Sequence, residues 1–277
     1  MALLRQSRLG RCVVLLAAWG AALGALAAEP AGRWIDQRQV GPFAIAAEFD
    51  LSQYEPMLAE LPALEREIRR VLATRPCNAP VTVMLAADED QHRAVLAARF
   101  PGLPYRRALY VKQGAAAVVF AYRQPELAVD LRHECTHALL HADLAMLPLW
   151  LDEGLAEYFE PQETDRAFGH PHAAAICREL SLGRVHSVAQ LEANTKLEEM
   201  SAEEYRSAWA WTHFMLHGPP EASEALWGFI ASIRRGEPPG RLSARLASRV
   251  PDLQGRFARH FRYWPQSQTA SERVQLR

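Results

Sequence analysis

The sequence has no excess of basic residues, and it carries neither internal repeats nor low-complexity tracts. It contains 31 lysine and arginine residues and 32 aspartate and glutamate residues, which gives a formal net charge of −1. A nucleic-acid-binding domain usually carries a clear positive charge, so nucleic acid is not an expected partner. The lack of repeats and long linkers excludes a solenoid and favours one unit with two subdomains. The 277 residues are 49% hydrophobic and 23% charged, which is typical of a globular protein.

The apolar run near the N-terminus is too short to span a bilayer. It covers Cys12–Leu26, whereas a spanning helix needs about 20 apolar residues. Three arginines precede it (Arg5, Arg8 and Arg11) and the small-residue triplet Ala25-Leu26-Ala27 ends it, which is the layout of a cleavable secretory signal. We therefore predict a signal peptide over residues 1–27, and its length disfavours the alternative of an uncleaved anchor. The remaining chain has 28 basic and 32 acidic residues, a formal net charge of −4, and is expected to be periplasmic or secreted with no stable membrane span.

Cysteine is scarce, with four residues in the whole chain. Outside the predicted signal, Cys77, Cys135 and Cys177 could form one disulfide in an oxidising compartment and leave one thiol over. Cys135 lies inside a predicted buried helix, so a bridge would join Cys77 to Cys177. Three reduced, buried cysteines are an equally good interpretation, and the sequence leaves both open.

Hydrophobic periodicity predicts an α+β fold with a small N-terminal sheet and a C-terminal helical lobe. Strands are expected at 43–49, 80–85, 107–112 and 116–122, with helices at 54–72 and 89–100. From residue 126 the pattern is almost wholly helical, with segments at 126–142, 149–159, 172–180, 187–193, 201–217, 221–235 and 241–263. The predicted domains are an α/β subdomain over 28–125, a helical catalytic subdomain over 126–264 and a polar tail over 265–277.

The first helix of that lobe contains the sequence His133-Glu134-Cys135-Thr136-His137. Two histidines four residues apart lie on one face of a helix, one turn apart, where both can bind the same metal ion. The helix around them is apolar, and burying two imidazoles and a carboxylate there is unfavourable without a partner. A Zn²⁺ ion suits neutral imidazole ligands, and a carboxylate beside it can take a proton from an attacking water. We therefore predict one zinc ion per chain, with Glu134 as general base.

The segment Trp150–Glu160, which reads WLDEGLAEYFE, adds a second motif after the first. Together the two motifs resemble the gluzincin metallopeptidases, most closely the small peptidase-MA-like proteins. This resemblance implies that Glu153 is the third metal ligand and that Gly154 allows two helices to approach closely. It also implies that Glu157, one turn further on, orients a ligating histidine.

The resemblance implies a zinc metallopeptidase that hydrolyses a peptide or protein substrate. The gluzincin aminopeptidases carry a glutamate on the strand before the zinc helix that binds the substrate's amino terminus. Here the corresponding residues, Gly114–Val118, include no carboxylate, so an endopeptidase is favoured. The strand over 116–122 is expected to be an edge strand that pairs with an extended peptide. The alternative is a zinc-binding, peptidase-like module of the cell envelope with little or no turnover; the sequence does not indicate an oligomeric state.

Four further residues are candidates for a role at the site. Tyr205 resembles the gluzincin tyrosine that donates a hydrogen bond to the developing oxyanion, although packing against neighbouring tryptophans explains it equally well. In metzincins the third ligand lies six residues after the second histidine, at Asp143 here, but the glycine that turns the chain in those sites is replaced by Leu140. His170 and His172 are candidates for lining the cleft. The spacing from His137 to Glu153 is also a few residues shorter than in the gluzincin aminopeptidases.

Overall fold

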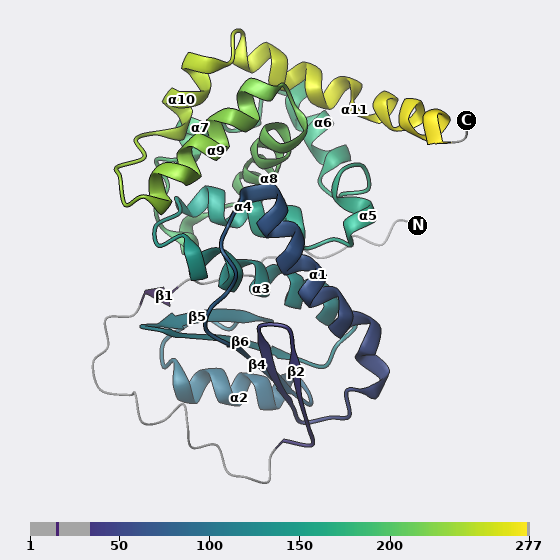
Figure 1. Cartoon of the computed structure of the whole chain (residues 1–277), viewed down its shortest axis with the longest axis vertical. Helices are drawn as coiled ribbons and strands as arrows, with labels where there is room; N and C mark the ends of the chain where they lie inside the picture. The colour runs from purple at the N-terminus through teal and green to yellow at the C-terminus, as the bar shows by residue number, and fades with distance from the viewer. Residues whose placement is uncertain (1–14, 17–33, 276–277) are drawn as a thin grey trace. The chain divides into compact units, whose positions relative to one another are not determined.

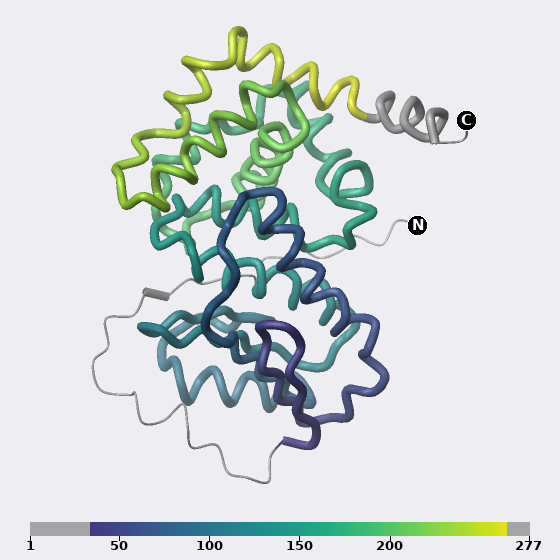
Figure 2. The backbone as a smooth tube through the Cα atoms, viewed as in Figure 1, coloured from purple at the N-terminus to yellow at the C-terminus, as the bar shows by residue number. Residues whose placement is uncertain are grey.

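The computed structural model describes residues 15–16 and 34–275. Most of the predicted signal peptide therefore lies outside the described residues. The chain divides into two compact units, whose backbones are traced in Figure 2. The first unit contains the sheet and its helices through Ala142, and the second contains Ile68–Arg75 together with the chain from Asp143 onward. The fold is α+β, as the sequence predicts.

A mixed sheet forms the first unit (Figure 1). Its five main strands are β2 (Asp36–Val40), β3 (Phe43–Ala47), β4 (Val81–Ala86), β5 (Leu109–Gln113) and β6 (Ala116–Tyr122). A two-residue strand, β1 (Leu15–Leu16), pairs in parallel with β5, and the strand order is β1-β5-β6-β4-β3-β2. The pairs β3–β4 and β4–β6 are parallel, whereas β2–β3 and β5–β6 are antiparallel hairpins.

The two faces of the sheet pack against different helices. Figure 1 shows α2 (Glu89–Arg99) on one side and α3 (Leu127–Asp143) on the other. The α2 side has an apolar core whose buried members are Met84, Leu96, Leu109, Val111, Val118 and Phe120. Since successive side chains of a strand alternate between faces, Tyr110 of β5 points to the α3 side. The remaining elements of this unit are η1 (Ser52–Tyr54) and most of α1 (Glu55–Leu72).

The strand order corrects one prediction. The strand over 116–122 was expected at the edge of the sheet, but β6 is hydrogen-bonded on both sides, to β5 and to β4. It has no free edge for a peptide. A local hairpin places β5 on one side of β6, and the long-range pairing with β4 encloses its other side; the residues of β6 alone do not indicate this second pairing.

The second unit is helical. Its elements are α4 (Leu149–Phe159), α5 (Glu163–Arg166), α6 (Ala173–Ser181), α7 (Val188–Leu191), η2 (Leu197–Glu199), α8 (Ala202–His217), α9 (Pro220–Arg234), α10 (Leu242–Arg249) and α11 (Leu253–Gln275). Serine caps start α7 and α8, each in a capping box with the residue three positions on. Among the described residues, none of the helices combines the length and the apolar character needed to cross a bilayer.

The C-terminal helix expected over 241–263 is two helices. Pro251 lacks an N–H, and Asp252 adopts a left-handed backbone with φ of 50°, so the helix ends at Arg249 and restarts at Leu253. The backbone of α11 then continues to Gln275, through most of the stretch expected as a polar tail.

The disulfide interpretation is wrong, because Cys77, Cys135 and Cys177 are all free thiols in the structure. Cys135 is buried, as expected. Cys77 is partly exposed and Cys177 is exposed, so the alternative of three buried thiols holds only for Cys135.

Gly154 sets the distance between α4 and α8. A Cβ atom at this position would lie 2.5 Å from Oγ1 of Thr212 and 2.6 Å from the carbonyl oxygen of Ala208. Both distances are far below normal contact, and the carbonyl belongs to the backbone of α8 and cannot rotate away. The expected role of Gly154 in close helix approach is therefore confirmed.

A cluster of neutral histidines and aromatic rings fills part of the same unit. His213 binds His260 at 2.9 Å and the Ala167 carbonyl at 2.9 Å, while the Tyr158 hydroxyl lies 2.8 Å from His217. His170 stacks on Trp209, with ring centroids 4.4 Å apart. Burial lowers the pKa of His170, His217 and His260 to about 4 and that of His213 to about 2.

We expect Gly154→Ala to lower the free energy of unfolding of the chain by about 1–3 kcal/mol, because the added methyl group overpacks the contact with α8. Urea unfolding followed by circular dichroism measures this loss. Gly228→Ala is the matched control within α9, where an added Cβ would lie 3.3 Å from a terminal side-chain nitrogen of Arg245 and would meet no backbone of another helix. The control should be neutral or stabilising by up to about 1 kcal/mol, and equal losses in both variants would contradict the packing argument.

The histidine cluster predicts a loss of stability in mild acid. Burial favours the neutral imidazoles, so their stabilising contribution is complete above pH 6.5 and is lost as the pH falls toward 4. His170 alone should account for roughly 2 kcal/mol between pH 7.5 and pH 5. Urea unfolding at the two pH values tests this, and His213→Gln, which cannot be protonated, should reduce the difference. A wild-type stability that is unchanged at pH 5 would refute the prediction.

Candidate metal centre

The helix α3 is buried along most of its length. Every residue from Asp130 to Leu140 is buried, and His133, Glu134 and His137 each have a side chain that is 0% exposed. The rings of the two histidines lie one turn apart, with centroids 5.1 Å from each other. Polar side chains buried to this degree need hydrogen-bond, charge or metal partners.

Tyr110 faces this helix from the sheet. Its ring is parallel to that of His137, with an interplanar angle of 9° and centroids 6.4 Å apart, and it also contacts His141. Because Tyr110 is itself only 1% exposed, it limits the rotation of the His137 imidazole. Tyr110 is not among the site residues predicted from the sequence.

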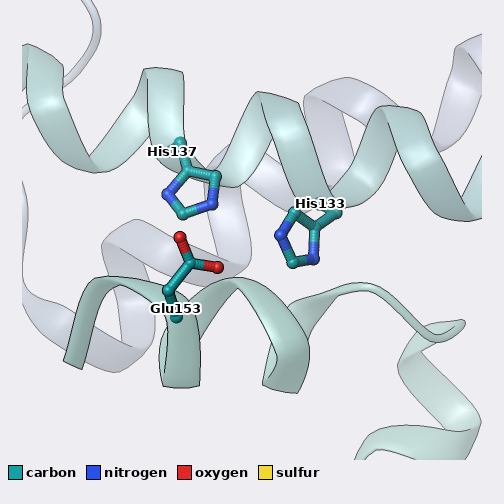
Figure 3. Close-up of side chains that lie close together, drawn as sticks. All are labelled: His133, His137 and Glu153. Carbon is teal, nitrogen blue, oxygen red and sulfur yellow. The ribbon is translucent and has the colours of Figure 1, made fainter. Parts of the chain in front are cut away.

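Glu153 is the acidic member of the group. It lies in the first half of α4, which follows α3 after residues 144–148, and it is 0% exposed. One donor atom from each of His133, His137 and Glu153 lies within 4.8 Å of the others. Figure 3 shows the two imidazoles of α3 directed toward the Glu153 carboxylate. Two imidazole nitrogens and a carboxylate oxygen form a donor set that can hold a metal ion, as predicted.

Two other groups in the described residues meet the same distance criterion. One consists of His137, His141 and Asp152, and the other of His133, Glu157 and Glu160. His141 therefore has an acidic neighbour in Asp152, a pairing that was not predicted from the sequence. The three groups share histidines, so they represent alternative positions for a metal ion and can be distinguished by mutation.

Glu134 belongs to none of these groups. Its Oε2 atom instead accepts a hydrogen bond from the backbone N–H of Tyr110 at 2.8 Å. The carboxylate is therefore held at β5, one position along the helix from the first histidine. A general base must not itself be a metal ligand, and the position of Glu134 outside the donor set meets this requirement. The role of general base stays a prediction.

One turn before Glu134, Asp130 fixes the start of α3. Its two carboxylate oxygens accept hydrogen bonds from Arg107 at 2.7 and 2.6 Å, and Gln124 donates to one of them at 2.8 Å. Asp130 is 1% exposed, so this bidentate pair is largely shielded from water. This role of Asp130 was not predicted. The sequence signal that could have indicated it is an acidic residue in the first turn of the helix, four positions before Glu134.

Glu157 receives a hydrogen bond on Oε2 from Nε2 of His172 at 2.9 Å, and its carbonyl oxygen lies 2.9 Å from Nε2 of His170. It also lies close to His133 in the second of the alternative groups. The predicted role in orienting a ligating histidine fits this position and stays a prediction.

The remaining candidates lie elsewhere. Tyr205 is in the first turn of α8 with a partly exposed side chain, and its oxyanion role stays a prediction. Asp143 ends α3, where Arg75 and Arg234 bind its carboxylate and lower its pKa. It belongs to none of the candidate groups in the described residues, which agrees with a helix-end residue.

Comparison with known families gives a match to part of the chain. Residues 128–238 match a family described as Protein of unknown function (DUF1570). The matched segment is less than half of the chain and includes His133, His137 and Glu153. No curated protein matches this sequence. The family match thus coincides with the candidate metal centre and does not assign it an activity.

The three candidate groups predict different patterns of metal loss. If the ion lies between His133, His137 and Glu153, Glu153→Ala should lower metal affinity by more than about 100-fold, because loss of a ligand exceeds the 10- to 100-fold effect of a supporting residue. His141→Ala and Glu160→Gln should retain stoichiometric metal, measured by mass spectrometry after dialysis. Loss of metal in His141→Ala with retention in Glu153→Ala would move the ion to His141 and Asp152.

Proposed function

We propose that this chain is a zinc-dependent metallopeptidase that cleaves peptide bonds within a chain. The observation that carries the proposal is the buried group of His133, His137 and Glu153, with Glu134 next in sequence to the first histidine. The family match supplies no activity, so the proposal depends on the chemistry of these side chains and on the resemblance to gluzincins.

The donor set favours zinc among the common divalent ions. Ca²⁺ and Mg²⁺ prefer six or more oxygen ligands, whereas two imidazoles and one carboxylate are a ligand set of catalytic zinc sites. When bound, zinc would lower the pKa of a coordinated water toward about 7 and polarise the scissile carbonyl. His133, His137 and Glu153 would hold the ion, and the stacking of Tyr110 on His137 would keep one ligand oriented.

The proton transfers are assigned to Glu134. Its carboxylate takes a proton from the water that attacks the carbonyl carbon and gives this proton to the amine nitrogen as the C–N bond breaks. The reaction therefore needs no covalent bond between enzyme and substrate. Tyr205 is proposed to donate a hydrogen bond to the oxyanion, as the gluzincin resemblance implies.

Two features support an endopeptidase. The residues of the β5–β6 hairpin, Gly114–Val118, provide no carboxylate for a free amino terminus. The two-residue β1 is the only strand that pairs with the outer edge of β5 in the described chain, so an extended peptide has a strand edge with which to pair. The N-terminal sequence supports export, and we place the activity in the periplasm or outside the cell.

Glu134→Gln should retain bound zinc and lose turnover by about 10²–10⁴-fold, the range typical of a general base. The assay is hydrolysis of an unfolded protein and of a peptide blocked at both ends. Cleavage of the blocked peptide by the wild type would support an endopeptidase, whereas cleavage of unblocked peptides alone would indicate an aminopeptidase. Stoichiometric zinc with no cleavage of any peptide would favour the alternative of a binding module.

A further inference from the structure

The backbone N–H of Tyr110 points to the outer edge of β5, on the side opposite β6. Gly114 and Ala115 form a two-residue turn between β5 and β6, so the pair Gln113–Ala116 that closes the hairpin is a hydrogen-bonded one. Pairs then alternate along the ladder, and Tyr110–Val119 falls on a pair without hydrogen bonds. The N–H and C=O of Tyr110 are therefore directed to the outer edge of β5.

That outward N–H is occupied by Glu134. Its Oε2 atom accepts the hydrogen bond at 2.8 Å, and a hydrogen bond to an ionised acceptor is among the stronger kinds. The site is closed to water on both sides of the bond, since Tyr110 is 1% exposed and Glu134 is 0% exposed. The proposed general base is thus bound to the edge strand in the structure.

The position of this contact is fixed by its neighbours. Arg107, three residues before Tyr110, binds Asp130, which is four residues before Glu134. Beyond it, the Lys112 ammonium donates to the carbonyl oxygen of His141. Together with the bond between Tyr110 and Glu134, these two contacts hold β5 alongside α3. The packing of the strand against the helix therefore places the Glu134 carboxylate at the edge of β5.

The same edge accepts an extended segment. Leu15 and Leu16 of β1 pair in parallel with Val111 and Lys112, immediately after Tyr110. A peptide that added to β5 as a strand and extended over Tyr110 would need the Tyr110 N–H for one of its own carbonyl oxygens. The peptide and Glu134 therefore require the same donor. Because one N–H cannot make two full hydrogen bonds, only one of these two acceptors can be bound at a time.

We propose that Glu134 and the backbone of an extended peptide compete for the Tyr110 N–H, so that strand pairing at β5 releases Glu134 for proton transfer. This inference rests on the proposed peptidase function and specifies its substrate: a segment long enough to pair as a strand over Tyr110. Short amides that reach the metal without pairing leave the carboxylate bound and are poor substrates.

Amide hydrogen exchange tests the resting contact. In wild-type protein the Tyr110 amide should be protected, and in Glu134→Ala it should exchange roughly tenfold faster or more, with the Lys112 amide as an internal control on the same edge. Unchanged protection of Tyr110 in Glu134→Ala, in a variant whose thermal unfolding shows that it is folded, would overturn the proposal.

Peptide binding tests the competition. Glu134→Ala and Glu134→Gln should both fail to cleave, so the dissociation constant of a hexapeptide blocked at both ends can be measured with each zinc-loaded variant by calorimetry. In Glu134→Gln the new amide side chain keeps a carbonyl oxygen for the Tyr110 N–H, so the alanine variant should bind the peptide about tenfold more tightly. The same two substitutions at Glu126, which is exposed just before α3, are made in the non-cleaving Glu134→Gln background as a control and should give equal affinities.

The possible outcomes distinguish failure of the proposed competition from failure of the proposed peptidase activity. Wild-type cleavage with equal affinities of the two Glu134 variants would overturn the competition and leave the peptidase proposal standing. Zinc binding without cleavage or peptide binding in any variant would overturn both. Faster Tyr110 exchange in Glu134→Ala together with its tighter peptide binding would support the competition.

Discussion

The burial of α3 is the constraint on which the rest of the candidate site depends. This helix presents Asp130, His133, Glu134 and His137 within a stretch that has almost no exposure to water. Charged and polar groups in such a place are unfavourable unless each has a partner. Arg107 partners Asp130, and the Tyr110 N–H partners Glu134. The two imidazoles lie beside Glu153, where a cation would compensate the buried carboxylate and use the imidazole nitrogens at once.

The alternation of side chains along β5 connects this polar helix to the apolar core. Leu109 and Val111 face α2 and fill the core on that side, which forces Tyr110 to the side of α3. A register shift of one residue would exchange the two faces and place apolar side chains against the histidines. The hydrophobic core on one face of the sheet therefore positions the aromatic ring and the backbone N–H that contact His137 and Glu134 on the other.

Local patterns in the sequence predicted most elements and the candidate metal-binding residues. The strands β3 to β6, α3 and α4 follow from periodicity, whereas β2 was not predicted; the candidate ligands follow from helical spacing together with a family resemblance. Two of the features that were missed depend on contacts between residues far apart in sequence. The place of β5 outside β6 is set by the pairing of the whole sheet, and the pair of Arg107 with Asp130 joins residues 23 positions apart. The break before α11 was missed because a periodic apolar pattern continues across Pro251.

A buried donor set does not by itself separate a hydrolase from a protein that only binds metal. Both need His133, His137 and Glu153, and both need Gly154 to let α4, which carries Glu153, lie close to α8. Under the proposed competition the difference lies in Glu134, whose Oε2 atom accepts the Tyr110 N–H in the structure and whose carboxylate is released for proton transfer when a peptide pairs with β5. In a binding module the bond to Tyr110 would be permanent, and Glu134 would then serve only to join α3 to β5. The proposed competition therefore makes the mobility of this one hydrogen bond the physical property that separates the two functions.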